Sequence, residues 1–147
     1  MFIHMSFGWK IAVLAESMST SLDKELRQIG LSINQWPTLL VLWNEDGLTQ
    51  SELTARSNTA HYTTTRLLDT LEKMKLVERC PHPTSRRAHL VYLTKKGRAL
   101  TKEAVAKAAL VNEQFFSDFT NKEQELLELL VLRMIQIQNA KLHTLGL

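Results

Sequence analysis

The chain has 147 residues, a length that suits one domain or one domain with a few extra helices. Hydrophobic residues make up 44% and charged residues 22%, which excludes a largely disordered chain. No apolar run approaches the ~20 residues of a membrane-spanning helix, and the single cysteine, Cys80, excludes an internal disulfide. We therefore expect a soluble protein of the reducing cytoplasm, without a membrane partner.

Positive charge is concentrated in the middle of the chain. Residues 56–102 contain eleven lysines and arginines but three acidic residues, whereas the remainder contains seven bases and twelve acids. A basic segment within an otherwise acidic chain is typical of a surface that binds a polyanion. A solvated basic face is the alternative.

The first half of the chain has helical periodicity. Apolar residues recur at three- and four-residue steps through residues 11–29, which indicates one face of a long helix that ends at Gly30. A second, mostly apolar helix follows. It starts at Ser32, with the spacing of a capping box, or at Asn34, which places Pro37 in the first turn, where proline is tolerated.

Two short helices joined by a tight break come next. Thr49 and Glu52 form a capping box that opens the first, which is expected to run to about Arg56. Residues 57–59 make the break, and the second helix is expected over residues 60–75. Two short helices with a three-residue turn, the second one basic, are the arrangement of a helix-turn-helix.

The second of these helices is predicted to present a polar face near its N-terminus. Its hydroxyl groups, phenol and guanidinium are of the kind that reads base edges and binds phosphates in a major groove. Its three consecutive threonines are poor helix formers, which indicates a role other than helix stability. An ordinary polar face is the alternative. The candidate DNA-contacting residues are His61, Tyr62, Thr63, Thr65 and Arg66.

The period then changes to that of strands. Residues 77–80 and 89–93 are rich in Val, Leu and Tyr, and the turn residues between them predict a β-hairpin. Arg86 and Arg87 lie at its tip without an adjacent acidic residue. Arginine suits a narrow minor groove, where negative potential is concentrated, so we expect the hairpin to act as a wing.

Two long helices complete the predicted elements. Thr94 caps the first, which has a glycine in its first turn, and Thr120 with Glu123 forms the capping box of the second. The second has an apolar face too broad for one neighbour in a small domain. We therefore expect the terminal helices, about residues 7–29 and 121–145, to be buried in a two-fold homodimer.

No catalytic apparatus is visible, so we predict that the protein is not an enzyme. Cys80, His82 and His89 lack the fourth ligand and the spacing of a metal site, and no metal or cofactor is predicted. Cys80 is either a small hydrophobe at a strand end or a redox-sensing thiol, because nearby arginines would favour its thiolate. Aromatic residues at helical spacing either pack in a core or interface or line a ligand pocket, with the candidates Trp9, Trp36 and Trp43.

Several motifs together are specific, although each alone is not. They are LTQSEL at 48–53, TRLLDTLEK at 65–73, LVER at 76–79, SRRA at 85–88 and VYLTKKG at 91–97. With these motifs in this order, the chain resembles the MarR family of bacterial transcription regulators, including its SlyA-like members, over almost its whole length.

The resemblance and the predicted elements agree on a mainly α fold with a small β-hairpin. We expect a winged helix-turn-helix over residues 33–100, flanked by helical dimerisation regions at 1–31 and 101–147. The resemblance implies a homodimer on double-stranded DNA, with the recognition helix in the major groove and the wing in the minor groove. It also implies a small aromatic effector that releases the DNA, and we predict a repressor of an inverted-repeat operator.

Three positions depart from the family pattern. Ser85 stands where Asp is usual, which predicts a looser wing tip, and Thr64 places a hydroxyl on the core face of the recognition helix. Lys75 replaces the usual glycine at the end of that helix, which predicts either a strained or a different termination. The alternatives to a DNA-binding regulator are a protein-interaction module on a winged-helix scaffold and a thiol-based redox regulator acting through Cys80.

Overall fold

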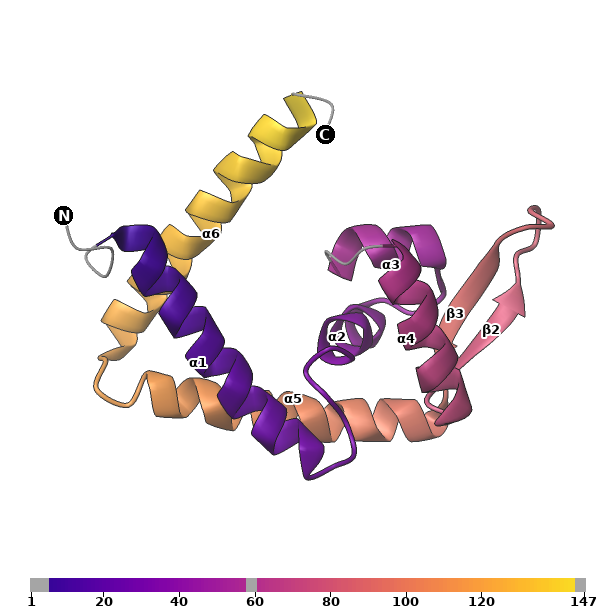
Figure 1. The fold of residues 1–147 in the computed structure, drawn as a ribbon, viewed down its shortest axis with the longest axis horizontal. Helices are drawn as coiled ribbons and strands as arrows, with labels where there is room; N and C mark the ends of the chain where they lie inside the picture. The colour runs from indigo at the N-terminus through magenta and orange to yellow at the C-terminus, as the bar shows by residue number, and fades with distance from the viewer. Residues whose placement is uncertain (1–5, 58–60, 145–147) are drawn as a thin grey trace. The chain divides into compact units, whose positions relative to one another are not determined.

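The computed structural model describes residues 6–57 and 61–144, and the chain divides into two compact units, Met1–Val111 and Asn112–Leu147. Figure 1 shows the elements in chain order: α1 (Phe7–Arg27), α2 (Trp36–Asn44), β1 (Leu48–Thr49), α3 (Gln50–Ser57), α4 (His61–Lys73), β2 (Val77–Pro81), β3 (His89–Leu93), α5 (Lys95–Phe115) and α6 (Asn121–Thr144). This mainly α content with a small sheet confirms the predicted fold class. Residues 58–60, which include most of the predicted break and the predicted start of the next helix, lie outside the described residues.

The first unit is built around a core of leucine and valine side chains. Each fully buried side chain of this kind contributes about 1.5–3 kcal/mol relative to an exposed one. Because these residues come from the end of α1, from α2, α3 and α4 and from the sheet, one core holds all these elements together. Its fully buried members are Leu26, Leu39, Leu42, Leu53, Leu68, Leu71, Leu76, Val77 and Val91.

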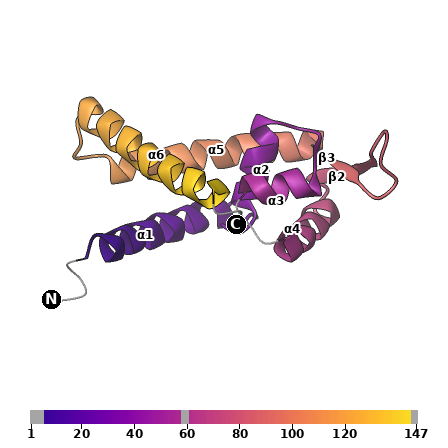
Figure 2. The same ribbon diagram turned by 90° about the horizontal axis from the view of Figure 1, so that it is seen from above.

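A three-stranded antiparallel sheet, in the order β1-β3-β2, forms one edge of this unit. The predicted hairpin is confirmed, because β2 pairs with β3 from Val77↔Leu93 to Pro81↔His89. The third strand, β1, was not predicted. It is two residues long and is defined by its pairing with β3, through Leu48↔Val91. In Figure 2 the hairpin projects beyond the helices of this unit.

Two predicted capping boxes are confirmed. The Thr49 N–H donates to Glu52 Oε2 at 2.8 Å, and the Glu52 N–H donates to Thr49 Oγ1 at 3.3 Å. Thr120 and Glu123 make the same pair of bonds at the start of α6, at 2.8 and 3.3 Å. In both boxes the threonine N–H is the main cause that lowers the pKa of the glutamate below its ordinary value.

Both predicted starts of α2 are wrong, since the helix begins at Trp36. The Ser32 N–H does donate to the Gln35 side chain, at 3.0 Å, as in a capping box. However, the Gln35 N–H donates to the Ser32 carbonyl at 3.1 Å, and this i+3 bond closes a turn before the helix. Pro37 is then the second residue of α2, where proline is tolerated.

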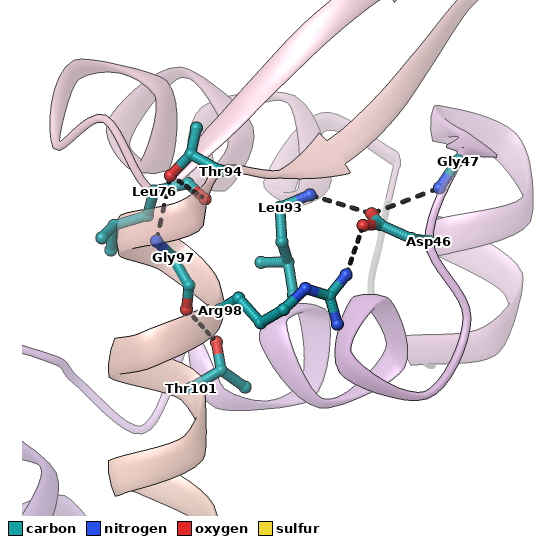
Figure 3. Close-up of polar contacts among 8 residues, drawn as sticks. All are labelled: Asp46, Gly47, Leu76, Leu93, Thr94, Gly97, Arg98 and Thr101. Carbon is teal, nitrogen blue, oxygen red and sulfur yellow. Dashed lines mark hydrogen bonds and ion pairs between the residues drawn. The ribbon is translucent and has the colours of Figure 1, made fainter.

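The base of the hairpin is tied to the start of α5 (Figure 3). The Thr94 N–H donates to the Leu76 carbonyl at 3.0 Å, and Thr94 Oγ1 accepts the Gly97 N–H at 2.9 Å, as the predicted cap requires. A Cβ atom on Gly97 would lie 1.9 Å from the Leu76 carbonyl oxygen. The first turn of α5 therefore needs glycine at this position for close backbone approach.

Asp46, in the turn after α2, joins three segments at the same base (Figure 3). Its Oδ1 accepts the N–H groups of Leu93 and Gly47, at 2.8 and 3.3 Å. Its Oδ2 accepts a bond from the Arg98 guanidinium at 2.7 Å, and this guanidinium lies 5.8 Å from the ring centroid of Trp43. One carboxylate thus connects the end of α2, the end of β3 and the start of α5.

The terminal helices expose apolar side chains. In α1, five such residues near the N-terminus are 42–61% exposed, and in α6 nine residues between Leu126 and Ile137 are 37–55% exposed. None of the described helices is both long enough and apolar enough to span a membrane. The expected roles of residues 1–31, 33–100 and 101–147 stay predictions.

Candidate nucleic-acid interface

α4 turns an apolar face to the core and a polar face outward, as its residue pattern predicts. Thr64, Leu68 and Leu71 are completely buried, whereas Arg66 is exposed. Among the described residues, none forms a hydrogen bond or ion pair with the Arg66 guanidinium. This cation is therefore available to a partner outside the chain.

Two threonines of α4 contact α3. The Thr64 hydroxyl, buried on the core face as expected, lies 3.0 Å from the Thr54 hydroxyl. Thr65 accepts a hydrogen bond from the Gln50 amide, so this predicted DNA-contacting residue also holds the two helices together.

The other predicted contact residues of α4 lie at its first turn. Thr63 is half-buried, and the side chains of His61 and Tyr62 lie outside the described part of the structure. Their contacts with DNA stay predictions.

A left-handed residue, Lys75, follows the end of α4, so the termination is the strained one of the two that were expected from the sequence. Lys75 has φ 61°, a conformation that costs a residue with a Cβ about 1 kcal/mol. The Leu76 N–H donates to the Leu71 carbonyl and the Lys75 N–H to the Glu72 carbonyl, both at 2.9 Å. This pair of bonds is a Schellman motif, and it directs the chain from α4 into β2.

Arg79 of β2 ties the hairpin to α4. Its guanidinium forms ion pairs with Asp69 and Glu72, and the hydrogen bond to Asp69 is the main cause that raises the pKa of Arg79. These are two of the three acidic residues in the basic segment 56–102. Because Asp69 and Glu72 are paired with Arg79, they do not neutralise the exposed Arg66 of the same helix.

The hairpin tip carries two further exposed cations. Within the described residues, the side chains of Arg86 and Arg87 have no hydrogen-bond or ion-pair partner. A groove of about 310 Å³ lies between the hairpin and the start of α3. The N–H groups of a first helical turn and a neighbouring arginine favour an anion. The groove is lined by Thr49, Gln50, Ser51, Arg79, Ser85, Arg87, Ala88, His89 and Val91.

The role of His82 was not predicted from the sequence. The N–H groups of Thr84 and Ser85 donate to His82 Nδ1 at 3.2 and 3.1 Å, so this ring closes the turn at the tip. In Asx turns, a side-chain acceptor likewise accepts hydrogen bonds from N–H groups a few residues later. The position of His82 two and three residues before Thr84 and Ser85 is the sequence signal that could have predicted this turn. The looser tip expected from Ser85 stays a prediction.

The remaining candidate residues lie elsewhere in the first unit. Trp36 and Trp43, near the two ends of α2, are partly buried against the core, and Trp9 in α1 is 42% exposed. Their role in a ligand pocket stays a prediction. Cys80 on β2 is a partly buried free thiol, and the adjacent Arg79 is engaged by acidic residues. In the described residues, no group of three or more His, Cys, Asp or Glu side chains could hold a metal ion.

Comparison with known proteins places the chain in a family. Residues 29–88 match the model of the MarR family. YsmB of Bacillus subtilis, an uncharacterized HTH-type transcriptional regulator, is 30% identical over 103 residues, which are 70% of this chain and 70% of that protein. The chain belongs to the MarR family. It is a transcriptional regulator and not an enzyme.

Solved structures share the fold of this MarR-family chain. A mutant MarR from Escherichia coli, complexed with operator DNA, has a TM-score of 0.83 and 22% identity, and covers 91% of this chain and 99% of its own. MepR of S. aureus, in a complex with DNA, has a TM-score of 0.81 and 22% identity, with 90% and 98% coverage. At these identities the likeness shows the winged-helix fold.

Proposed function

We propose that this MarR-family protein binds double-stranded DNA as a homodimer and represses transcription from an inverted-repeat operator. The observation that carries the proposal is the exposure of Arg66, Arg86 and Arg87 on two projecting elements of one module. The two acidic residues of α4, Asp69 and Glu72, pair with Arg79 instead. The cations are thus free to bind phosphates and base edges.

The placement of these arginines suits the two grooves of a duplex. A major groove is just wide enough for a helix, so α4 would enter it with Arg66, Tyr62 and Thr65 toward the bases. Arg87, assisted by Arg86, would enter the minor groove, where negative potential is concentrated. The groove beside α3 would then take the phosphate backbone. The two DNA complexes among the structural neighbours support this arrangement.

The exposed apolar faces of α1 and α6 support the homodimer. Monomeric proteins rarely expose contiguous apolar patches larger than a few hundred Å². A second copy of this chain presents the same faces, and a two-fold axis pairs them. Two recognition helices related by that axis require a DNA site with inverted half-sites. The aromatic effector stays a prediction.

Selection of DNA by the purified full chain tests the proposal. We expect the chain to enrich an inverted repeat from a random-sequence duplex library. Arg66→Ala and Arg87→Ala should each weaken binding to the selected duplex by about tenfold, because each removes a contact worth about 1–3 kcal/mol. Fluorescence anisotropy at fixed salt measures this change.

Arg27→Ala is the charge-matched control. Arg27 ends α1 and pairs with Asp23 at the surface, so its loss should leave affinity within twofold of the wild type. Equal affinities of Arg66→Ala, Arg87→Ala and Arg27→Ala would contradict the proposed contacts. Failure to enrich any duplex would instead favour a protein-interaction module.

The dimer and the repressor role need separate measurements. Light scattering of the full chain at micromolar concentration should give twice the mass of the 16.8 kDa protomer. In a reporter assay with the selected site overlapping the promoter, the protein should lower transcription. A monomeric mass would contradict the proposed dimer through the apolar faces of α1 and α6. Increased transcription would contradict repression from that site.

A further inference from the structure

The tip of the β2–β3 hairpin is closed by one imidazole. Just beyond the two strands, the last backbone bond across the hairpin runs from the His82 N–H to the Ala88 carbonyl, at 3.2 Å. Beyond it, over residues 83–87, the structure describes no hydrogen bond between backbone groups. The bonds from the Thr84 and Ser85 N–H groups to His82 Nδ1 close the turn in their place.

This geometry requires the neutral form of His82. A ring nitrogen that accepts N–H donors carries a lone pair and no proton, so the ring proton resides on Nε2. Proton uptake at Nδ1 would place a third N–H group against the two backbone donors. Both hydrogen bonds would be lost, and the turn that precedes Arg86 would open.

We propose that His82 is a positioning residue for DNA binding: its neutral imidazole closes the turn that presents Arg86 and Arg87, and proton uptake opens it. The closed tip requires the neutral ring, so it is favoured at high pH and lost at low pH. Affinity for DNA therefore falls as the pH falls. The inference rests on the proposed DNA-binding function.

The charged groups around His82 are Glu52 of α3, which interacts with it electrostatically, and Arg86 and Arg87 on its own loop. A histidine that only touched a phosphate would bind DNA more tightly when protonated. The direction of the pH effect thus separates a role in closing the turn from a direct contact.

The test replaces His82 with a residue that accepts hydrogen bonds but has no titratable group. The probe is the duplex selected by the wild-type chain, measured at about pH 8 and about pH 5.5 at constant ionic strength. Wild type should bind about tenfold more weakly at the lower pH, the factor expected from one to two lost hydrogen bonds. His82→Asn keeps an acceptor at Oδ1, so its affinities at the two pH values should be equal.

Two further variants complete the comparison. His82→Ala has no acceptor and should bind about tenfold more weakly than His82→Asn at about pH 8. Arg27→Ala, the control outside the proposed DNA-binding surface, leaves His82 in place and should keep the pH dependence of the wild type. Equal pH dependence in the wild type and His82→Asn, or its loss in Arg27→Ala, overturns the proposal.

A readout without DNA separates this inference from the proposed function. In ¹⁵N-edited spectra of the free chain, the amide signals of Thr84 and Ser85 should shift with pH along the titration of the His82 ring. If the wild type binds no duplex at about pH 8, the proposed function fails, while these amides still show whether His82 closes the tip. Amides that do not respond to the titration of His82 overturn the closure itself.

Discussion

The two ends of the β2–β3 hairpin are held in different ways. At the base, the Leu76 carbonyl, the Thr94 cap and the Asp46 carboxylate connect the hairpin to α2 and α5 through several independent bonds. At the tip, a single ring nitrogen of His82 orders the turn. Elements that bind partners are drawn from the less stable parts of a fold. The proposed contacts with the minor groove thus lie at the end of the hairpin that is held by fewer bonds.

The largest expected effect on stability comes from a substitution at Gly97, at the base of the β2–β3 hairpin. Gly97→Ala would place a methyl group against the Leu76 carbonyl, which must move, so we expect a loss of about 3 kcal/mol in the free energy of unfolding. Chemical denaturation measures it. Gly8→Ala is the control, because a Cβ there meets nothing within 4 Å. Similar stabilities of the two variants would contradict the close approach at the base.

Removal of the Asp46 carboxylate should have the next largest effect. Asp46→Ala leaves the N–H of the buried Leu93 without its acceptor and should cost about 2 kcal/mol. Asp46→Asn keeps an acceptor oxygen and loses only the ion pair with Arg98, which should cost less than about 1 kcal/mol. If the two variants lose equal stability, the ion pair and not the backbone acceptor holds the base.

The junction between α4 and the hairpin can be strengthened. Lys75→Gly relieves the left-handed backbone and should raise the free energy of unfolding by about 0.5–1 kcal/mol. Lys73→Gly, within the last turn of α4, should lower it by about 1 kcal/mol. Denaturation midpoints that move in the same direction for both variants would argue against strain at Lys75.

The smallest expected effect is at Glu52, which caps α3. Because the Thr49 N–H lowers the pKa of Glu52, the cap stabilises the fold above the ordinary carboxyl pKa of about 4.3 and loses this effect as the pH falls through the lower, folded value. Glu52→Gln should therefore be less stable than the wild type at neutral pH and equally stable in strong acid. A stability difference that does not change with pH would exclude the charged cap.

Local sequence patterns predicted the elements whose contacts are local. Each of the capping boxes Thr49–Glu52 and Thr120–Glu123 joins two residues three positions apart in the sequence. The buried face of α4 follows from helical spacing alone. The predicted start of α2 was wrong, although the contacts that decide it are also local. The bond between Ser32 and Gln35 forms as expected, but it surrounds a turn instead of a helix.

Contacts between distant segments could not be predicted in the same way. β1 exists because Leu48 pairs with Val91, and Gly97 is required because the Leu76 carbonyl approaches it. The candidate interface shows the same limit. The exposed arginines followed from composition and spacing, whereas the role of His82 depends on how its ring is oriented in the folded turn.

The salt dependence of binding to the selected duplex tests DNA recognition by the exposed arginines most directly. If the dimer neutralises about six phosphates, the logarithm of the association constant should fall against the logarithm of salt concentration with a slope of about −5. Arg87→Ala should make this slope shallower. An affinity that hardly changes between low and physiological salt would contradict a DNA-binding role for Arg66, Arg86 and Arg87.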